Sequence, residues 1–342
     1  MRPQRSCRLH SDSGRRIDSA VTILETARAL KAGEVVAFPT ETVYGLGADA
    51  RNADAVSAIY RIKGRPPNHP LIVHVSGPSM ALDWAHWTSQ AQRLADAFWP
   101  GPLTLILTRL DAAPPYACGG QDSIGLRCPS HPVAQALLEA FEALGGNGVA
   151  APSANRFGRV SPTSAEHVRA DLGDSVSWIL DGGSAEIGIE STIVDLSRSQ
   201  PALLRPGRIQ ASAIESVLGA SLAAPDASAP RVSGSMPSHY APDTPVELIA
   251  AESFLFRLGV IADTGEPFVV WARRERPIAL AARLNLIWHR APELPVDFEQ
   301  ALYARLREFD QIGVERIVIE RPPTEPEWFA VLDRLQRASA RR

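Results

Sequence analysis

The chain has 342 residues with a formal net charge of −3; 45% of the residues are hydrophobic and 21% are charged. This length is about twice that of an average domain, so two globular domains are expected, and the slightly acidic balance disfavours stable binding to nucleic acid, which requires a surplus of cations. Three scattered cysteines exclude a disulfide framework or a CxxC zinc site and fit reduced thiols in a cytoplasmic protein, and no apolar run reaches the length of a membrane span.

The first 16 residues contain five Arg and lack the apolar segment of a targeting signal, so they are predicted to be a disordered tail. From residue 17 to 218, short β-branched runs alternate with patterns of helical period. Strands are predicted at 34–38, 71–75, 103–107, 123–127, 148–151, 176–180 and 192–196, and helices at 53–63, 90–98, 132–144 and 164–172. The alternation predicts an α/β domain in which helices cover a sheet that need not be all parallel.

Residues 219–245 differ in composition, because 18 of these 27 positions are Gly, Ala, Ser or Pro. Such a segment cannot form a core of its own and is predicted to be a linker. It contains the sequence SHYAP at 238–242, which is chemically more specific than a spacer requires. A second, smaller α/β domain is predicted over 246–342, with strands at 259–262, 268–272, 284–288 and 316–320 and helices at 298–309 and 328–338.

Polar residues gather in several places beside predicted strands, where ligands of α/β proteins usually bind. The segment PTETVYGLG at 39–47 follows the first strand, although a simple polar turn would explain it equally well. Lys63 and Arg65 lie at the end of a helix and could bind phosphate, but cations at this position also interact favourably with the helix dipole. His74 lies in an apolar strand and, taken alone, suggests a core histidine. Arg127 also lies in an apolar strand and needs a partner, either a ligand carboxylate or a structural Asp or Glu.

The sequence lacks the common signatures of nucleotide-binding and hydrolytic enzymes. It contains no GxxxxGK[ST] loop, no GxGxxG after the first strand, no GxSxG and no HExxH. Any ATP site must therefore be of another kind.

Taken together and in order, the motifs resemble those of the YrdC-like threonylcarbamoyl-AMP synthase family in its long form, which has a C-terminal domain. The matching segments are PTETVYGLG from Pro39, KxRP from Lys63, His74, WPGPLT from Trp99, GLRxP from Gly125, PSAN from Pro152, ESTIVD from Glu190, RPG from Arg205 and SHYAP from Ser238. They span nearly the whole chain, although the second domain carries no specific motif and the first 16 residues match nothing. The resemblance implies a YrdC-like fold with a twisted mixed sheet, followed by a Rossmann-like C-terminal domain.

The resemblance also implies a reaction, in which L-threonine, bicarbonate and ATP give threonylcarbamoyl-AMP and pyrophosphate for tRNA modification. By motif position, the residues expected around L-threonine are Thr40, His74, Arg127, Ala151 and Ser191. Those expected around ATP are Lys63, Arg65, Asn68, Ser123, Ser153, Asn155, Arg205 and Tyr240. No protein nucleophile is expected; Lys63 and Arg65 would stabilise charge, Mg²⁺ would be held by the ATP phosphates, and Tyr240 would close the site from the linker. Downstream threonylcarbamoyl-transferase proteins would be partners, and tRNA would be contacted at most indirectly.

Two other interpretations remain open from the sequence. Lys63, Arg65 and Arg205 could form a basic concave surface for tRNA or double-stranded RNA in a protein without adenylation activity. The domain could also belong to another carbamoyl-transfer enzyme, although the chain lacks the Cys-rich finger segments of the larger carbamoyltransferases.

Overall fold

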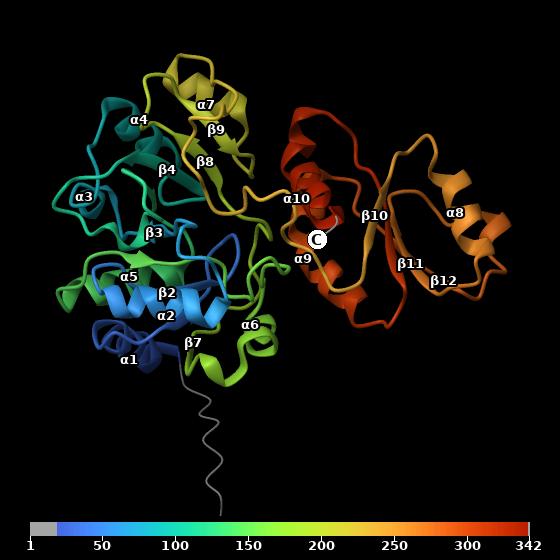
Figure 1. Ribbon diagram of the computed structural model, residues 1–342, viewed down its shortest axis with the longest axis horizontal. Coiled ribbons are helices and arrows are strands. Elements are labelled where there is room, and N and C mark those ends of the chain that lie inside the picture. Colours follow the sequence, from blue (N-terminus) through green and yellow to red (C-terminus); the bar gives the residue numbers. More distant parts are fainter. Residues whose placement is uncertain (1–18, 341–342) are drawn as a thin grey trace, which may run out of the picture.

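The computed structural model describes residues 19–340 as two α/β domains connected by a long segment (Figure 1). The helices of the first domain are α1 (Ser19–Lys31), α2 (Ala53–Lys63), α3 (Pro78–Ala81), α4 (Ser89–Phe98), α5 (Pro132–Ala143), α6 (Ala165–Leu172) and α7 (Ala211–Leu218). Its strands are β1 (Val36–Phe38), β2 (Gly45–Asp49), β3 (Ile72–His74), β4 (Leu103–Thr108), β5 (Ser123–Arg127), β6 (Val149–Ala150), β7 (Trp178–Ile179), β8 (Thr192–Asp195) and β9 (Ala202–Arg205). The tail predicted at 1–16 lies outside the described residues.

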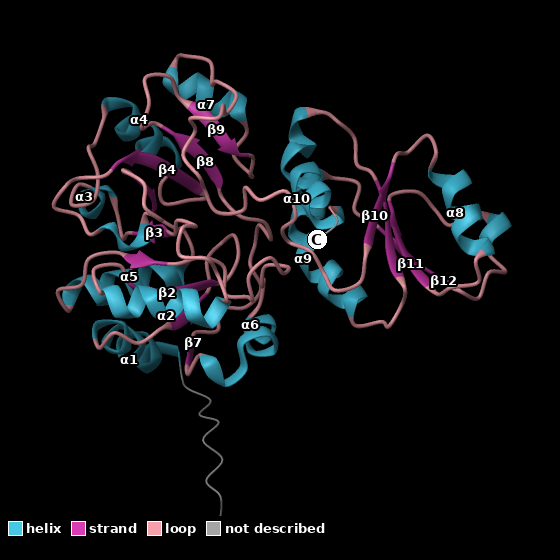
Figure 2. Ribbon diagram, in the orientation of Figure 1, coloured by secondary structure: helices cyan, strands magenta, loops and turns pink. Residues whose placement is uncertain are grey.

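The first domain is built on one nine-stranded sheet with the order β7-β1-β2-β6-β3-β5-β4-β8-β9 (Figure 2). The sheet contains both parallel and antiparallel pairs, which confirms the predicted mixed sheet. Because successive strand residues point to opposite faces, one face packs on a core that includes α2, α4 and α7, and the other packs on α1 and α5. The helices α1 and α5 cover only part of the second face. Over β3, β4 and β8 this face is covered instead by Val232, from the segment that connects the domains.

Local sequence fixes both ends of α2, and the loop to β3 begins at its C-terminal end. The Asn52 side chain accepts hydrogen bonds from the backbone N–H groups of residues 54 and 55 and thereby caps the helix N-terminus. Gly64 ends the helix with a left-handed φ of 66°, as its position in the sequence predicts. The chain therefore turns sharply between Lys63 and Arg65.

The polar segment 39–47 is only partly a loop, because Gly45–Asp49 form β2. The segment lacks the alternation of apolar and polar residues that would predict this strand. A Cβ atom at Gly47 would lie 2.7 Å from the Val149 side chain and 2.8 Å from the Phe38 ring. Glycine here allows close packing inside a sheet rather than a turn.

The C-terminal domain has a four-stranded, all-parallel sheet with the order β10-β13-β11-β12. Its elements are β10 (Val246–Ile249), α8 (Phe254–Asp263), β11 (Phe268–Ala272), β12 (Leu286–Arg290), α9 (Pro295–Asp310), β13 (Arg316–Glu320) and α10 (Phe329–Ser339). The helices α9 and α10 cover the face toward the first domain, and α8 covers the far face (Figure 1). The expected smaller α/β domain is confirmed.

One predicted strand of this domain is wrong. Residues 259–262 lie in α8, where Phe254, Leu258 and Ile261 are buried at helical spacing. A run of four apolar residues is too short to distinguish a strand from a buried stretch of helix. The first strand of the domain is instead β10.

Residues 219–245 contain no helix or extended strand, yet they are held against both domains. Gln121 and Arg231 exchange side-chain and backbone hydrogen bonds at 2.7 and 3.1 Å, which attach the segment to the first domain. The backbone N–H of His239 donates to Arg337 of α10 at 3.3 Å. The linker thus lies between the domains, and its own contacts hold it there. Among residues 19–340, no helix combines the length and hydropathy needed to cross a membrane.

Candidate active site

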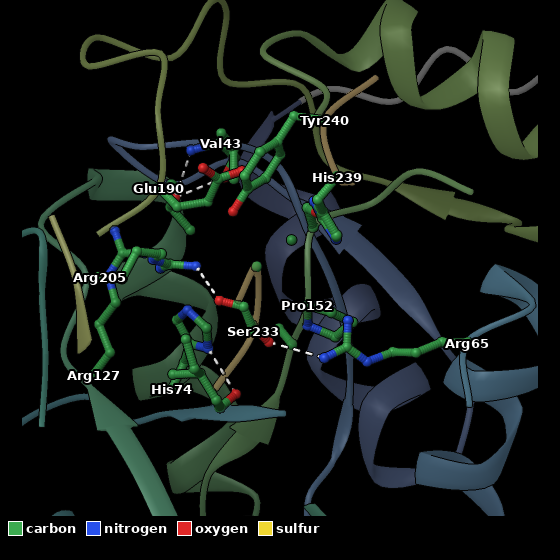
Figure 3. Close-up of a pocket in the computed structure, with 16 residues that line it drawn as sticks. Val43, Arg65, His74, Arg127, Pro152, Glu190, Arg205, Ser233, His239 and Tyr240 are labelled. Carbon is green, nitrogen blue, oxygen red and sulfur yellow. Dashed lines mark hydrogen bonds between the residues drawn. The ribbon is translucent and has the colours of Figure 1, made fainter. Parts of the chain in front are cut away.

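A cavity with an empty volume of about 520 Å³ lies on the sheet face that α1 and α5 leave open (Figure 3). The linker lies across its entrance. It is lined by Thr40, Val43, Gly45, Arg65, Ile72, His74, Arg127, Ala151, Pro152, Ser153, Glu190, Arg205, Ser233, Gly234, His239 and Tyr240. Polar and charged side chains converge on it, as they do on small-molecule sites.

Strand register brings the polar residues of the cavity floor together. His74 of β3 pairs with Arg127 of β5, and Arg127 pairs with Thr104 of β4. The three side chains therefore form a row on one face of the sheet, because directly opposed residues point the same way. A sequence pattern shows only that each strand contains polar residues; the register makes these three neighbours.

Arg127 has a structural partner, which the sequence left open as one of two possibilities. Its Nη2 donates to Oε1 of Glu41 at 2.7 Å, and both side chains are buried. The other carboxylate oxygen of Glu41 accepts from the backbone N–H of Ser130 at 3.1 Å. Arg127 nevertheless faces the cavity, and its buried Nε has no hydrogen-bond partner among the described residues.

His74 is a neutral polar group in the cavity floor. Burial, together with the positive charge of Arg127, lowers the pKa of His74 to about 3. Its Nδ1 lies 3.3 Å from the carbonyl oxygen of Ile72, and its ring packs edge-on against Phe38. A neutral imidazole in this position can orient a ligand without adding charge.

Two further arginines reach the cavity and both contact Ser233 of the linker (Figure 3). Arg65 donates to the Ser233 hydroxyl at 3.0 Å, and Arg205 donates to the Ser233 carbonyl oxygen at 2.9 Å. Burial lowers the pKa of Arg65 to about 10 and lowers that of Arg205 as well, but arginine with such a pKa stays charged at neutral pH. Among residues 19–340 no carboxylate is bonded to either cation, and two such cations favour an anionic ligand.

The linker supplies two polar groups that lack partners. The Tyr240 hydroxyl and the His239 Nδ1 are buried in the cavity wall without a hydrogen-bond partner among the described residues. Tyr240 is also the one non-glycine residue in the described part of the chain with a positive φ, 59°. Unpaired buried polar groups and strained backbone both cluster at ligand sites.

Glu190 is the only carboxylate among the residues that line the described cavity. Burial alone would raise its pKa, but the charges of Arg334 and Arg205 and hydrogen bonds from Ser161 and Tyr303 outweigh burial and lower it to about 2. Glu190 is therefore a fixed negative charge at neutral pH rather than a general base.

Eight of the thirteen residues predicted for the site line this one cavity. These are Thr40, His74, Arg127 and Ala151 from the predicted threonine set and Arg65, Ser153, Arg205 and Tyr240 from the predicted ATP set. The Thr40 hydroxyl is already engaged in its own turn, since it donates to the Val43 carbonyl oxygen at 2.7 Å.

Lys63 and Asn155 lie behind the cavity wall. The Lys63 ammonium donates to the carbonyl oxygens of Ser153 and Asn155, each at 2.6 Å. Burial and the neighbouring charge of Arg65 lower the pKa of Lys63 well below its usual value. In this structure Lys63 holds the loop that carries Ser153, and its direct role toward phosphates stays a prediction.

The other three predicted residues have different positions. Ser191 is fully buried and hydrogen-bonds to Thr104 at 2.8 Å and to Arg205 at 3.1 Å, so it supports Arg205. Ser123 lines a smaller neighbouring cavity under Val232. Asn68 is exposed and lies outside both sets of lining residues.

Sequence analysis did not include several residues of the cavity wall in the predicted site. Glu190 and Pro152 were part of the quoted motifs, and His239 adjoins Tyr240 within SHYAP, so motif membership was an available signal for these. Ser233 and Gly234 lie in a part of the linker of low complexity, where no pattern distinguishes them.

The predicted RNA-binding surface is not present in the structure as an accessible patch. Lys63, Arg65 and Arg205 are only 3%, 6% and 4% exposed. Binding to an RNA backbone requires cations that phosphates can reach from solvent. These cations instead face a small enclosed space or the protein itself.

The fold and the cavity together define a two-domain α/β protein with a cation-lined cavity beneath an interdomain linker. A family model described as telomere recombination matches residues 28–207, and one described as the C-terminal domain of threonylcarbamoyl-AMP synthase matches residues 209–340. The threonylcarbamoyl-AMP synthase of Bacillus subtilis is 38% identical, over 94% of this chain and 93% of its own length. That of Schizosaccharomyces pombe is 33% identical over 89% of this chain and 85% of its own.

A solved structure shows the same arrangement. The crystal structure of Pyrococcus abyssi Sua5 complexed with L-threonine has a TM-score of 0.84 and 33% sequence identity, and the match covers 95% of this chain and 96% of that one. The chain belongs to the threonylcarbamoyl-AMP synthase family, as the motifs predict.

Proposed function

We propose that this chain forms threonylcarbamoyl-AMP and pyrophosphate from L-threonine, bicarbonate and ATP. The observation that carries the proposal is the cavity itself, which combines buried cations with unpaired buried donors and has no activated nucleophile among its described lining residues. Family membership supports the same reaction, because the relatives are named for its product.

The proposed threonine end is the floor formed by β3 and β5. Arg127 keeps an unpaired Nε after its ion pair with Glu41, so it can bind the ligand carboxylate while remaining fixed in place. His74 and Thr40 add neutral polar groups next to it. A floor of this kind suits a small zwitterion such as threonine.

The proposed ATP end is formed by Arg65, Arg205 and the loop that carries Ser153. The triphosphate would exchange the hydrogen bonds that both arginines now make to Ser233 for bonds to phosphate oxygens. Charge-assisted hydrogen bonds of this type contribute about 1.5–3 kcal/mol each. The linker would thus move or tighten as the nucleotide enters.

The chemistry requires alignment rather than covalent catalysis. The threonine amine and bicarbonate form a carbamate with loss of one water molecule. A carbamate oxygen then attacks the α-phosphorus of ATP; a new O–P bond forms and the bond to pyrophosphate breaks. Two anions must be held close together against their repulsion, which fixed cations achieve. A closed linker would also exclude water from the reactive mixed anhydride.

The described residues contain no cluster of three or more His, Cys, Asp or Glu arranged as ligands. Glu190, the cavity carboxylate, is fully engaged with its neighbours. We therefore propose that Mg²⁺ enters as part of the MgATP substrate, and we assign no step to it.

We further propose that the product passes to separate threonylcarbamoyl-transferase proteins that act on tRNA. The product is a mixed anhydride that hydrolyses easily, so it must be consumed soon after release. Lys63, Arg65 and Arg205, the cations that direct binding of tRNA would use, are buried.

The experiment is pyrophosphate release from ATP with bicarbonate and Mg²⁺, comparing L-threonine with L-serine and with no amino acid. We expect strong dependence on threonine and weak release with serine. A folded protein without threonine-dependent release would overturn the proposal, and RNA binding titrated with salt would then become the decisive measurement.

A further inference from the structure

A side chain of the C-terminal domain reaches the wall of the cavity. Arg334 of α10 is completely buried, although arginine is seldom buried without partners. Its Nε donates to Oε2 of Glu190 at 3.0 Å, and its Nη1 donates to the carbonyl oxygen of Pro206 at 2.9 Å. Nη1 also contacts Asp333 at 2.7 Å, which helps balance the buried charge.

The two residues that Arg334 contacts in the first domain belong to separate loops of the site. Glu190 lines the cavity and lies two residues before β8, and Pro206 immediately follows Arg205 at the end of β9. One planar guanidinium therefore connects the beginning of β8 with the end of β9. A planar group with a fixed fork of donors sets the distance between two such acceptors more rigidly than a point charge would.

These two loops hold the predicted ATP-binding arginine between them. Arg205 donates from Nε to the Ser191 carbonyl oxygen at 3.0 Å and from Nη2 to the Ser191 hydroxyl at 3.1 Å. The backbone of Arg205 thus adjoins Pro206, which is one contact of Arg334. Its side chain is bonded to Ser191, the residue that follows Glu190, the other contact of Arg334. Any shift of Arg334 moves both supports of Arg205.

Arg334 also contacts the aromatic groups that close the cavity from the linker side. Its guanidinium lies 5.5 Å from the centre of the Tyr240 ring, and the Tyr240 ring stacks on Tyr303 of α9 with centroids 5.5 Å apart. The Tyr303 hydroxyl donates to the same carboxylate oxygen of Glu190 at 2.8 Å. The linker, the C-terminal domain and the cavity wall therefore share one buried network.

We propose that Arg334 is a positioning residue through which the docked C-terminal domain aligns Arg205 for ATP, by fixing Glu190 and Pro206. This inference rests on the proposed function. It assigns the C-terminal domain a direct part in the adenylation site, because the site of the first domain is incomplete without this side chain.

Loss of Arg334 has a specific consequence. Glu190 would remain as a buried carboxylate without its main counter-charge, and Arg205 is the other cation whose charge lowers its pKa. Glu190 would then attract Arg205 away from the nucleotide. Removing both charges together avoids this, so the double variant should recover part of what the single variant loses.

The test uses the full-length chain. It compares the single variants Arg334→Met and Arg334→Lys with the double variant that combines Glu190→Gln and Arg334→Met. Arg307→Met is the matched control. Arg307 also joins the domains, through Asp171 and the carbonyl oxygens of Val160 and Ser161. It does not touch Glu190 or Pro206 itself, and it reaches Glu190 only indirectly, through the Ser161 hydroxyl. Melting temperature, kcat, and KM for ATP and for threonine are measured by pyrophosphate release.

For Arg334→Met we expect kcat/KM for ATP to fall by about 10²-fold, the size of loss that a displacement near 1 Å causes. KM for threonine and all parameters of Arg307→Met should change by less than about threefold, which corresponds to well under 1 kcal/mol. The double variant should regain about tenfold over Arg334→Met if removal of the stranded charge restores about 1.4 kcal/mol, and Arg334→Lys should fall between wild type and Arg334→Met.

Two outcomes would overturn the inference while wild-type activity remains. One is an equal loss for Arg334→Met and Arg307→Met at equal melting temperature, and the other is a loss that affects threonine as much as ATP. A wild-type chain without threonine-dependent activity would instead refute the proposed function, so the two failures are distinguishable.

Discussion

Individual polar side chains of this cavity perform different tasks although the sequence presents them alike. Arg127 is bound to a structural carboxylate and still faces the cavity. The Lys63 ammonium, behind the cavity wall, instead donates its hydrogen bonds to backbone carbonyl oxygens. Their difference lies in which atoms remain unpaired. Unpaired donors next to a cavity are the best guide to ligand contacts, because a buried donor without a partner is costly in the absence of ligand.

Tyr240 allows a sharp test at the residue scale. Its buried hydroxyl lacks a partner, so Tyr240→Phe should leave the free energy of unfolding unchanged or slightly higher. If the hydroxyl binds ligand, KM for ATP should rise about three- to tenfold, as expected for the loss of one neutral hydrogen bond. Steady-state kinetics and urea denaturation of the same preparation measure both quantities.

Tyr240→Ala is a weaker test of the same hydroxyl. The Tyr240 ring packs between His239 and Tyr303, so truncation would also remove packing that stabilises the interface. An unchanged KM in the Phe variant with a large loss in the Ala variant would show that the ring, not the hydroxyl, is required.

Arg127 should control affinity for threonine rather than for ATP. Arg127→Met paired with Glu41→Gln removes both charges and avoids a stranded carboxylate. We expect KM for threonine to rise at least about tenfold, and KM for ATP to change little, since a charge-assisted bond of about 1.5–3 kcal/mol is lost at one end only. Calorimetric titration with threonine alone checks this, and threonine binding as tight as in the wild type would contradict the assignment.

At the scale of elements, the site depends on how the linker lies across the sheet. Val232 covers the apolar patch over β3, β4 and β8, and Ser233 then lies between Arg65 and Arg205. The segment is rich in small residues. Its composition does not make it a free spacer in the folded protein.

Gly234 should be intolerant of a side chain for this reason. It has a φ of 79°, and a Cβ there would lie 1.9 Å from the Tyr240 hydroxyl oxygen. Gly234→Ala should therefore displace Tyr240 and lower kcat/KM for ATP by about tenfold or more, in addition to backbone strain of order 1 kcal/mol. The matched control is Gly219→Ala, at a left-handed position with open space around it, and equal kinetic losses in both variants would argue against the displacement of Tyr240.

At the scale of the whole molecule, buried neutral histidines link stability to pH. The pKa values of His74 and His239 are both lowered to about 3, mainly by burial. Between about pH 6.5 and 3 the unfolded chain therefore binds protons that the native chain does not. The contribution of these histidines to the free energy of unfolding is fully present above about pH 6.5 and falls as the pH decreases. Glu190 adds a further loss of stability in acid. Its pKa is lowered to about 2 in the native chain, so its stabilising charge is fully present above the pKa of an unfolded glutamate and is lost as the pH falls toward 2.

We expect the free energy of unfolding to decrease between pH 7 and 5, with each histidine contributing at most about 1.4 kcal/mol per pH unit. Urea denaturation across this range measures the slope. His239→Gln should reduce the slope, and a midpoint independent of pH from 7 to 5 would count against neutral burial of both histidines.

The sequence by itself determined the alternation of strands and helices, two domains and the motifs that carry the family resemblance, because these features are local in the chain. Where a local pattern was too short, as at 259–262, or was masked by glycine, as in β2, the prediction was wrong or incomplete. Eight predicted residues meet in one cavity because strand register and a linker far away in sequence place them there. Only the tertiary structure decided which polar atoms remain unpaired, and only it brought Arg334 to Glu190, since contacts across more than a hundred residues depend on packing that no local pattern encodes.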